Sequence, residues 1–254
     1  MSEFKIAVAQ ISSVKGNIKA NIQRHISVIK RAKEQGVTVL VFPELSLTGY
    51  ELALAKELAL TIDDPQLEPL KKLAVELNMY IVVGAPIKSS SDTSNSDAIS
   101  LGAIIFAAAG DVSVYKKMHL HATEQLYFKA GKSYTMLEIQ GQRIALAICA
   151  DTNAASHIKA YVNDNATVYV AAVLFSENGY LADTQKLAAY AQQHNILVTM
   201  ANHNRPSGGL LAIGKSAAWG PKGLLACANE PQDCLVISQP VNNNWVSQVI
   251  ECKA

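Results

Sequence analysis

The sequence of 254 residues has no long hydrophobic run, although 50% of its residues are hydrophobic. A helix needs roughly 18 to 20 consecutive apolar residues to cross a bilayer, and no segment approaches that length. The first residues also lack the apolar region and the cleavage site of a signal peptide. We therefore expect a cytoplasmic protein with no membrane partner.

An excess of charge of either sign is also absent. The 22 basic and 21 acidic residues leave a formal net charge of +1. No stripe of basic residues interleaved with aromatic residues runs along the sequence, as is typical of nucleic-acid-binding proteins. The composition therefore predicts neither nucleic acid nor another polyanion as a partner.

Cysteine is scarce, with four residues at Cys149, Cys227, Cys234 and Cys252. No pair has CxxC spacing, and no cluster of cysteine and histidine has the spacing of a zinc site, so we expect no metal. Because the chain is long and has no export signal, we expect the thiols to be reduced rather than paired in disulfides.

Apolar segments of two periodicities alternate along the chain. Alternating or continuous apolar residues predict the strands 4–10, 37–42, 80–85, 98–107, 112–115, 134–139, 142–148, 167–173, 196–201, 216–219 and 235–239. Helical spacing predicts a helix that opens at Asn17 and stops before Gly36, one or two helices in 52–77, and helices at 152–163 and 181–194. The polar segment 89–96 is expected to be a surface loop.

This order of elements predicts a layered α/β fold with a mixed sheet or two packed sheets. We find no internal repeat and no composition shift that marks a boundary. The length suits one well-packed domain, so we expect a single domain over residues 1–254.

Three chemically reactive side chains come directly after predicted strands. Glu44 follows 37–43, Lys117 follows 112–116, and Cys149 follows 143–148. A residue at a strand exit is held rigidly and still meets a substrate. An acid, a base and a thiol at such positions indicate nucleophilic catalysis.

The segments around these residues resemble the nitrilase, or carbon–nitrogen hydrolase, superfamily. They read VFPELSLTGY at 41–50, YKKMHL at 115–120 and ICAD at 148–151. The resemblance implies a four-layer α-β-β-α sandwich of two mixed sheets with a Glu-Lys-Cys triad. It also implies a homodimer or higher homo-oligomer, to which the apolar segment 245–250 would contribute.

The resemblance assigns a role to each residue of the triad. Cys149 is the expected nucleophile, Glu44 the general base and acid, and Lys117 the electrostatic stabiliser. Glu124 matches a second glutamate of the family and is expected to position Lys117 or to bind the substrate. The backbone N–H of Ala150 is expected to help Lys117 bind the oxyanion. This chemistry needs no metal or organic cofactor.

Each of these residues also has a simpler interpretation. A buried cysteine is most often a small core residue, and Lys116 competes with Lys117 for the role in the site. Adjacent strand residues face opposite sides, so one of the two lysines faces the site. Tyr50 either lines the pocket or packs against its neighbours.

Two further polar residues, His119 and Asn202, are interpreted as structural, although Asn202 matches an asparagine common in the family. The remaining cysteines are interpreted as non-catalytic, and the two tryptophans as packing or interface residues.

The sequence departs from the family pattern near the nucleophile. Ala150 stands where many members have an aromatic residue, and 152–157 replaces a Phe-Pro-Glu-like turn. Residues 190–194 replace an Arg-Ala-x-Glu-Asn-like pattern. We expect an amidase-type enzyme that hydrolyses a small linear amide or carbamoyl compound with water through a thioester. The alternatives are a nitrile hydrolase and a catalytically weak binding or regulatory protein.

Overall fold

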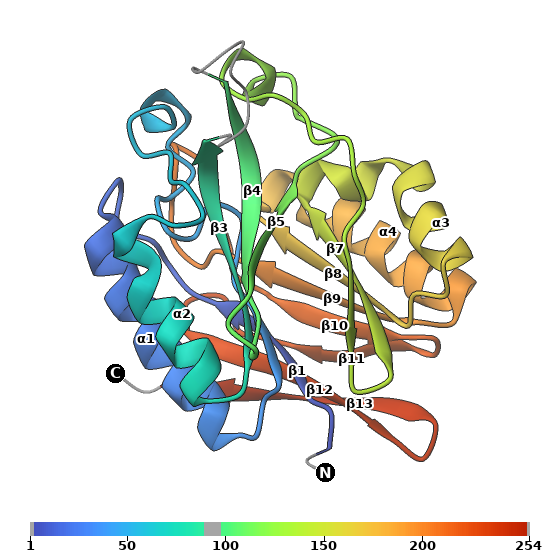
Figure 1. The fold of residues 1–254 in the computed structure, drawn as a ribbon. Coiled ribbons are helices and arrows are strands. Elements are labelled where there is room, and N and C mark those ends of the chain that lie inside the picture. The colour runs from blue at the N-terminus through green and yellow to red at the C-terminus, as the bar shows by residue number, and fades with distance from the viewer. Residues whose placement is uncertain (1–2, 89–97, 253–254) are drawn as a thin grey trace.

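Two mixed β-sheets pack face to face, and helices cover the outer side of each sheet (Figure 1). The computed structural model describes residues 3–88 and 98–252. The predicted loop 89–96 lies outside the described residues. The α-β-β-α sandwich that the resemblance implied is confirmed.

The first sheet has seven strands in the described part of the chain. Their order is β13 (Asn244–Glu251), β12 (Cys234–Val241), β1 (Ile6–Gln10), β2 (Val39–Val41), β3 (Tyr80–Lys88), β4 (Ile99–Phe106) and β5 (Val112–Lys116). Strands β1, β2 and β3 are parallel, and the other neighbours are antiparallel.

The second sheet has six strands in the same described part. Their order is β11 (Gly223–Cys227), β10 (Ala217–Gly220), β9 (Leu197–Asn202), β8 (Val168–Val173), β7 (Gln142–Ile148) and β6 (Met136–Ile139). Strands β7, β8 and β9 are parallel, with antiparallel strands on both sides.

Helices α1 (Ile18–Glu34) and α2 (Glu68–Glu76) lie against the first sheet. Helices α3 (Ala155–Asn163) and α4 (Glu177–His194) lie against the second (Figure 1). The side chain of Asn17 accepts a hydrogen bond from the Ala20 N–H at 3.0 Å, which confirms the predicted N-cap of α1. Short 3₁₀ turns are η1 (Leu52–Leu54), η2 (Pro65–Leu67), η3 (Glu124–Leu126) and η4 (Cys149–Asn153).

The central strands are buried on both faces because each sheet lies between two apolar layers. In β1, Ile6 and Val8 point into the layer between the sheets, while Ala7 and Ala9 point toward α1 and α2. This explains why the strand is continuously apolar instead of alternating with polar residues.

Some boundaries differ from the prediction. The predicted helix 152–163 is divided into η4 and α3, and α4 begins at Glu177 rather than 181. Two strands, β11 and β13, were not predicted. Residues 220–223 therefore turn from β10 into β11, and the chain does not pass directly from β10 to the strand predicted at 235–239. No helix in the described residues is long and apolar enough to cross a membrane.

Candidate active site

The topology brings the three predicted residues to one edge of the sandwich. Strand β5 runs in the same direction as β2, because β4 is antiparallel to both β3 and β5, and β3 is parallel to β2. A parallel bridge between Ile11 and His203 joins the ends of β1 and β9 across the two sheets. The exits of β2, β5 and β7 therefore meet, and they carry Glu44, Lys117 and Cys149.

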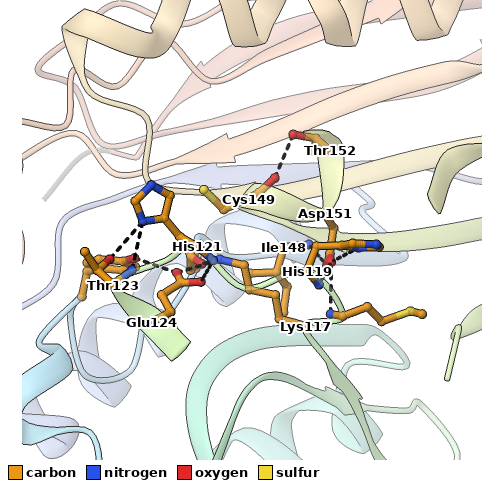
Figure 2. A network of polar contacts seen from close by, with 12 residues as sticks. Lys117, His119, His121, Thr123, Glu124, Ile148, Cys149, Asp151 and Thr152 are labelled. Carbon is orange, nitrogen blue, oxygen red and sulfur yellow. Dashed lines mark hydrogen bonds and ion pairs between the residues drawn. The ribbon is translucent and has the colours of Figure 1, made fainter. Parts of the chain in front are cut away.

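Lys117 lies between two glutamates in the interior. Its Nζ donates to Glu44 Oε1 at 2.6 Å and to Glu124 Oε1 at 2.7 Å. Lys117 and Glu124 are 0% exposed and Glu44 is 1% exposed. Figure 2 shows Glu124 reaching Lys117 from the η3 turn. This ion triplet confirms that Lys117 points inward, whereas Lys116 lies at an intermediate level of exposure.

Two further donors hold Glu124 in this orientation. The hydroxyl of Tyr50 donates to Glu124 Oε1 at 2.6 Å, and the His121 N–H donates to Oε2 at 2.8 Å. Burial, followed by the negative charges of Glu44 and Glu124, raises the pKa of Tyr50 well above its ordinary value, so the hydroxyl keeps its proton. Tyr50 thus orients Glu124 through its hydroxyl.

The two oxygens of Glu44 have different partners. Lys117 binds Oε1, while within residues 3–88 and 98–252 no nitrogen or oxygen donor binds the buried Oε2. The thiol of Cys149 is the further hydrogen-bonding group that faces this carboxyl. Burial raises the pKa of Glu44 to about 7, and the charge of Lys117 opposes that rise. The carboxyl is therefore suited to exchange protons near neutral pH.

Cys149 lies at a sharp turn between β7 and η4 and is partly buried. Its φ is 42°, in the left-handed region that non-glycine residues rarely adopt. Such conformations are frequent at functional sites, where surrounding contacts hold them in place. The N–H of Ala150 belongs to the first turn of η4, and N–H groups of a first turn have no partner within their own helix.

The thiol of Cys149 holds its proton more tightly than an ordinary cysteine does. Burial, followed by the negative charge of Glu44, raises its pKa above the ordinary value. Lys117 and a backbone hydrogen bond with Leu174 lower the pKa by less. The ammonium of Lys117 thus does lower the thiol pKa, but burial and the charge of Glu44 outweigh it. The resting thiol is protonated, and its proton must leave during attack.

The backbone of Glu44 is fixed by a residue that sequence reasoning missed. His203 follows β9, is 0% exposed, and lies 2.7 Å from the Glu44 carbonyl oxygen through Nε2. Burial lowers the pKa of His203 to about 4, so it is neutral and Nε2 carries the donated hydrogen. A polar residue directly after a buried strand was the signal in the sequence, as it was for Glu44.

The other candidate residues lie outside the ion triplet. Asn202 is buried and binds backbone atoms of Phe175 and Gly214, which is a structural role. His119 contacts Asp151 at 3.1 Å, beside the turn that carries Cys149. All four cysteines are free thiols, and the other three lie on β11, β12 and directly after β13. Among the described residues no group of three or more His, Cys, Asp and Glu side chains is arranged to hold a metal ion.

Comparison with known proteins places the chain in a family. The family model for carbon–nitrogen hydrolases matches residues 5–246. The chain belongs to the carbon–nitrogen hydrolase family. A protein named "Probable nitrilase" from Schizosaccharomyces pombe is 26% identical over 243 residues, which cover 93% of this chain and 88% of that protein.

A second relative matches over less of its length. A 2-oxoglutaramate amidase from Bacillus subtilis is 29% identical over 65% of this chain and 63% of its own. In fold, the chain is similar to an amidase from Nesterenkonia sp. AN1, a variant of which was solved with butyramide. The TM-score is 0.84 at 22% identity, and the match covers 95% of this chain and 92% of that one.

Proposed function

We propose that this chain hydrolyses the carbon–nitrogen bond of a small linear amide or carbamoyl compound, with Cys149 as the nucleophile. The observation that carries the proposal is the buried 2.6 Å contact between Glu44 and Lys117 beside the partly buried thiol. A proton acceptor, a fixed cation and a thiol are the three groups that attack on an amide requires. Relatives named as amidases support an amide as substrate.

In the first half of the reaction, Glu44 takes the thiol proton while the sulfur of Cys149 attacks the amide carbon. The carbonyl oxygen becomes negative, and Lys117 and the N–H of Ala150 stabilise it. In comparable sites one such donor contributes about 3 to 4 kcal/mol. Protonated Glu44 then gives its proton to the leaving nitrogen. Ammonia or an amine departs, and the acyl group remains on Cys149 as a thioester.

In the second half, water attacks the thioester carbon and Glu44 takes a proton from that water. The carbon–sulfur bond breaks, the thiolate of Cys149 takes the proton from Glu44, and the carboxylic acid leaves. Glu124 keeps Lys117 in place throughout, because it binds the same ammonium at 2.7 Å.

The proposal is tested by ammonia release from pairs of amides and nitriles that share one acyl group. Wild type and Cys227→Ala, a matched control at an exposed thiol, should both release ammonia from amides. Cys149→Ala should release none above background. Release from nitriles alone would instead favour a nitrilase, the activity in the name of the relative from Schizosaccharomyces pombe. Ligand binding without any release would favour a binding or regulatory protein.

A further inference from the structure

Asp151, two residues after Cys149, is a buried carboxylate that accepts hydrogen bonds from three backbone N–H groups and one hydroxyl, and its Oδ1 also contacts the His119 ring at 3.1 Å. Its Oδ2 accepts from the Ile148 N–H at 3.0 Å and from the Tyr115 hydroxyl at 2.6 Å. Its Oδ1 accepts from the N–H groups of Met118 at 3.1 Å and His119 at 2.8 Å. Figure 2 shows Asp151 between Ile148 and His119.

These donors come from the two strand exits that carry the site. Tyr115 and Met118 flank Lys117 at the end of β5 in the first sheet, and Ile148 precedes Cys149 at the end of β7 in the second. One carboxylate thus connects the backbone around Lys117 to the backbone next to Cys149. The left-handed turn at Cys149 needs contacts of this kind to persist.

A chain of hydrogen bonds runs from Tyr169 through His157 and Tyr115 to Asp151 and orients its carboxylate. The Tyr115 hydroxyl donates to Asp151 and lies 2.8 Å from His157 Nε2, while His157 Nδ1 lies 2.9 Å from the Tyr169 hydroxyl. Since Tyr115 uses its hydrogen on Asp151, its oxygen accepts from His157 Nε2–H, and Tyr169 donates to Nδ1. All four side chains are buried.

Two of the supporting side chains, His157 and Tyr190, lie in the segments where the sequence departs from the family pattern. His157 ends the segment 152–157 that replaces the Phe-Pro-Glu-like turn. Tyr190, in the departure at 190–194, donates to the Thr152 carbonyl oxygen at 2.9 Å. In this chain the turn after Cys149 is therefore supported by tyrosine and histidine side chains.

We propose that Asp151 is a positioning residue that sets the place of the Lys117 ammonium relative to the Cys149 sulfur. The inference rests on the proposed function, since it concerns the same site. Asp151 does not contact the reacting atoms and acts through the backbone on either side of them. Tyr115, His157 and Tyr169 keep its two oxygens aimed at the two strand exits.

An amide cannot replace this carboxylate. Each oxygen of Asp151 accepts at least two hydrogen bonds, so either orientation of an asparagine turns its NH₂ group toward at least two donors. Asp151→Asn therefore keeps the shape of the side chain and loosens one of the two strand exits. Asp111→Asn removes the same charge at an exposed position that precedes β5 and is the matched control.

The test compares kcat, KM and the pH dependence of kcat/KM. We expect Asp151→Asn to lower kcat about 100-fold and to change KM less than threefold, while Asp111→Asn matches wild type. The acid limb of kcat/KM should move to higher pH, because Lys117 lowers the pKa of Glu44 and is displaced in the variant. Tyr115→Phe removes one donor to Asp151. It should lower kcat and move the acid limb in the same directions as Asp151→Asn, but by less. It replaces Asp151→Asn in the test if that variant does not fold.

Alkylation of Cys149 by iodoacetamide, followed by peptide mass spectrometry, separates this inference from the proposed function. The alkylation rate needs no turnover, and we expect Asp151→Asn to lower it at least tenfold even if no amide is hydrolysed. Wild-type rates and an unchanged acid limb in the folded variant would overturn the positioning role. The role would also be overturned if kcat/KM of Asp151→Asn fell by the same factor at every pH and that factor equalled the decrease in the fraction of protein whose Cys149 can be alkylated.

Discussion

At the scale of single residues, Glu44 has one oxygen on Lys117, and its carboxyl lies beside the thiol of Cys149. The burial that raises its pKa to about 7 makes it a proton acceptor above that pH and a proton donor below it. We predict that kcat/KM for an amide rises with pH and levels off with an apparent pKa near 7. A pH–rate profile in buffers of constant ionic strength measures it. A profile that is flat from pH 5 to 8 would rule out Glu44 as the base.

Lys117 compensates two buried carboxylates at once. If Lys117→Met removes the ammonium, Glu44 and Glu124 remain side by side in the interior without a cation. Breaking a buried ion pair in this way costs about 3 to 5 kcal/mol, so we predict that loss in the free energy of unfolding together with loss of activity. Denaturant titration measures the first. Lys116→Met, at a partly buried neighbour, should change unfolding by less than about 1 kcal/mol.

The sequence was enough to predict that Glu44, Lys117 and Cys149 would be brought together, because each follows an apolar strand within a recognisable segment. It was not enough to place Tyr50 on Glu124, or His203 behind Glu44, because those contacts join segments 74 and 159 residues apart. The sequence also could not predict whether the pKa of the Cys149 thiol is raised or lowered. That direction depends on how strongly burial outweighs one ammonium, and burial is a property of the folded chain.

At the scale of elements, a glycine lies behind each of two strand exits. A Cβ built on Gly84 of β3 would lie 2.3 Å from the Leu45 nitrogen and 2.7 Å from the Pro43 carbonyl oxygen. A Cβ on Gly131 would lie 2.2 Å from the Lys116 carbonyl oxygen. Backbone therefore packs directly on the backbone that presents Glu44 and Lys117.

We predict that Gly84→Ala displaces the turn at Glu44. Overpacking of a tight interior costs about 1 to 3 kcal/mol, and activity should fall at least tenfold because Glu44 moves away from Cys149. Thermal unfolding and ammonia release measure the two effects. Gly179→Ala is the control, because it lies in α4 with an ordinary φ and near a flexible Asp183 side chain. Equal behaviour of the two variants would contradict the packing explanation.

The strands of the central layers were predictable, whereas β11 and β13 were not, for a physical reason. Both are edge strands with no fully buried residue, so neither has the buried face that marks the central strands. One signal was present: Asn242 and Asn243 form the two-residue loop between β12 and β13 with φ of 48° and 61°. Asparagine tolerates this conformation, which two-residue hairpin loops require at both positions.

At the scale of the whole molecule, two buried histidines link stability to pH. Burial lowers the pKa of His25 and His203 to about 4 each, below the ordinary 6.5. The unfolded chain therefore binds more protons between pH 6.5 and 4, so stability falls as pH falls through that window. The slope is about 1.4 kcal/mol per pH unit for each histidine. We predict that His203→Gln and His25→Gln each reduce the slope of unfolding free energy against pH by that amount, as measured by denaturant titrations at several pH values. Unchanged slopes would show that neither histidine is buried in its neutral form.

The edges of the two sheets bear on assembly, which stays a prediction. Strand β13 forms one edge of the first sheet, and Val246 and Val249 on it are 43% and 37% exposed. The apolar segment 245–250 that we expect at an interface between copies thus lies on an accessible strand.

The most direct test of the proposed chemistry is the mass of the peptide that contains Cys149 after acid quenching during turnover of an amide. Attack by sulfur with loss of ammonia leaves one acyl group in place of the thiol hydrogen. We predict this acyl mass on Cys149 in wild type, one equivalent of ammonia per acyl group formed in the first turnover, and neither product in Cys149→Ala. Ammonia release by Cys149→Ala at the wild-type rate would contradict a mechanism in which Cys149 is the nucleophile.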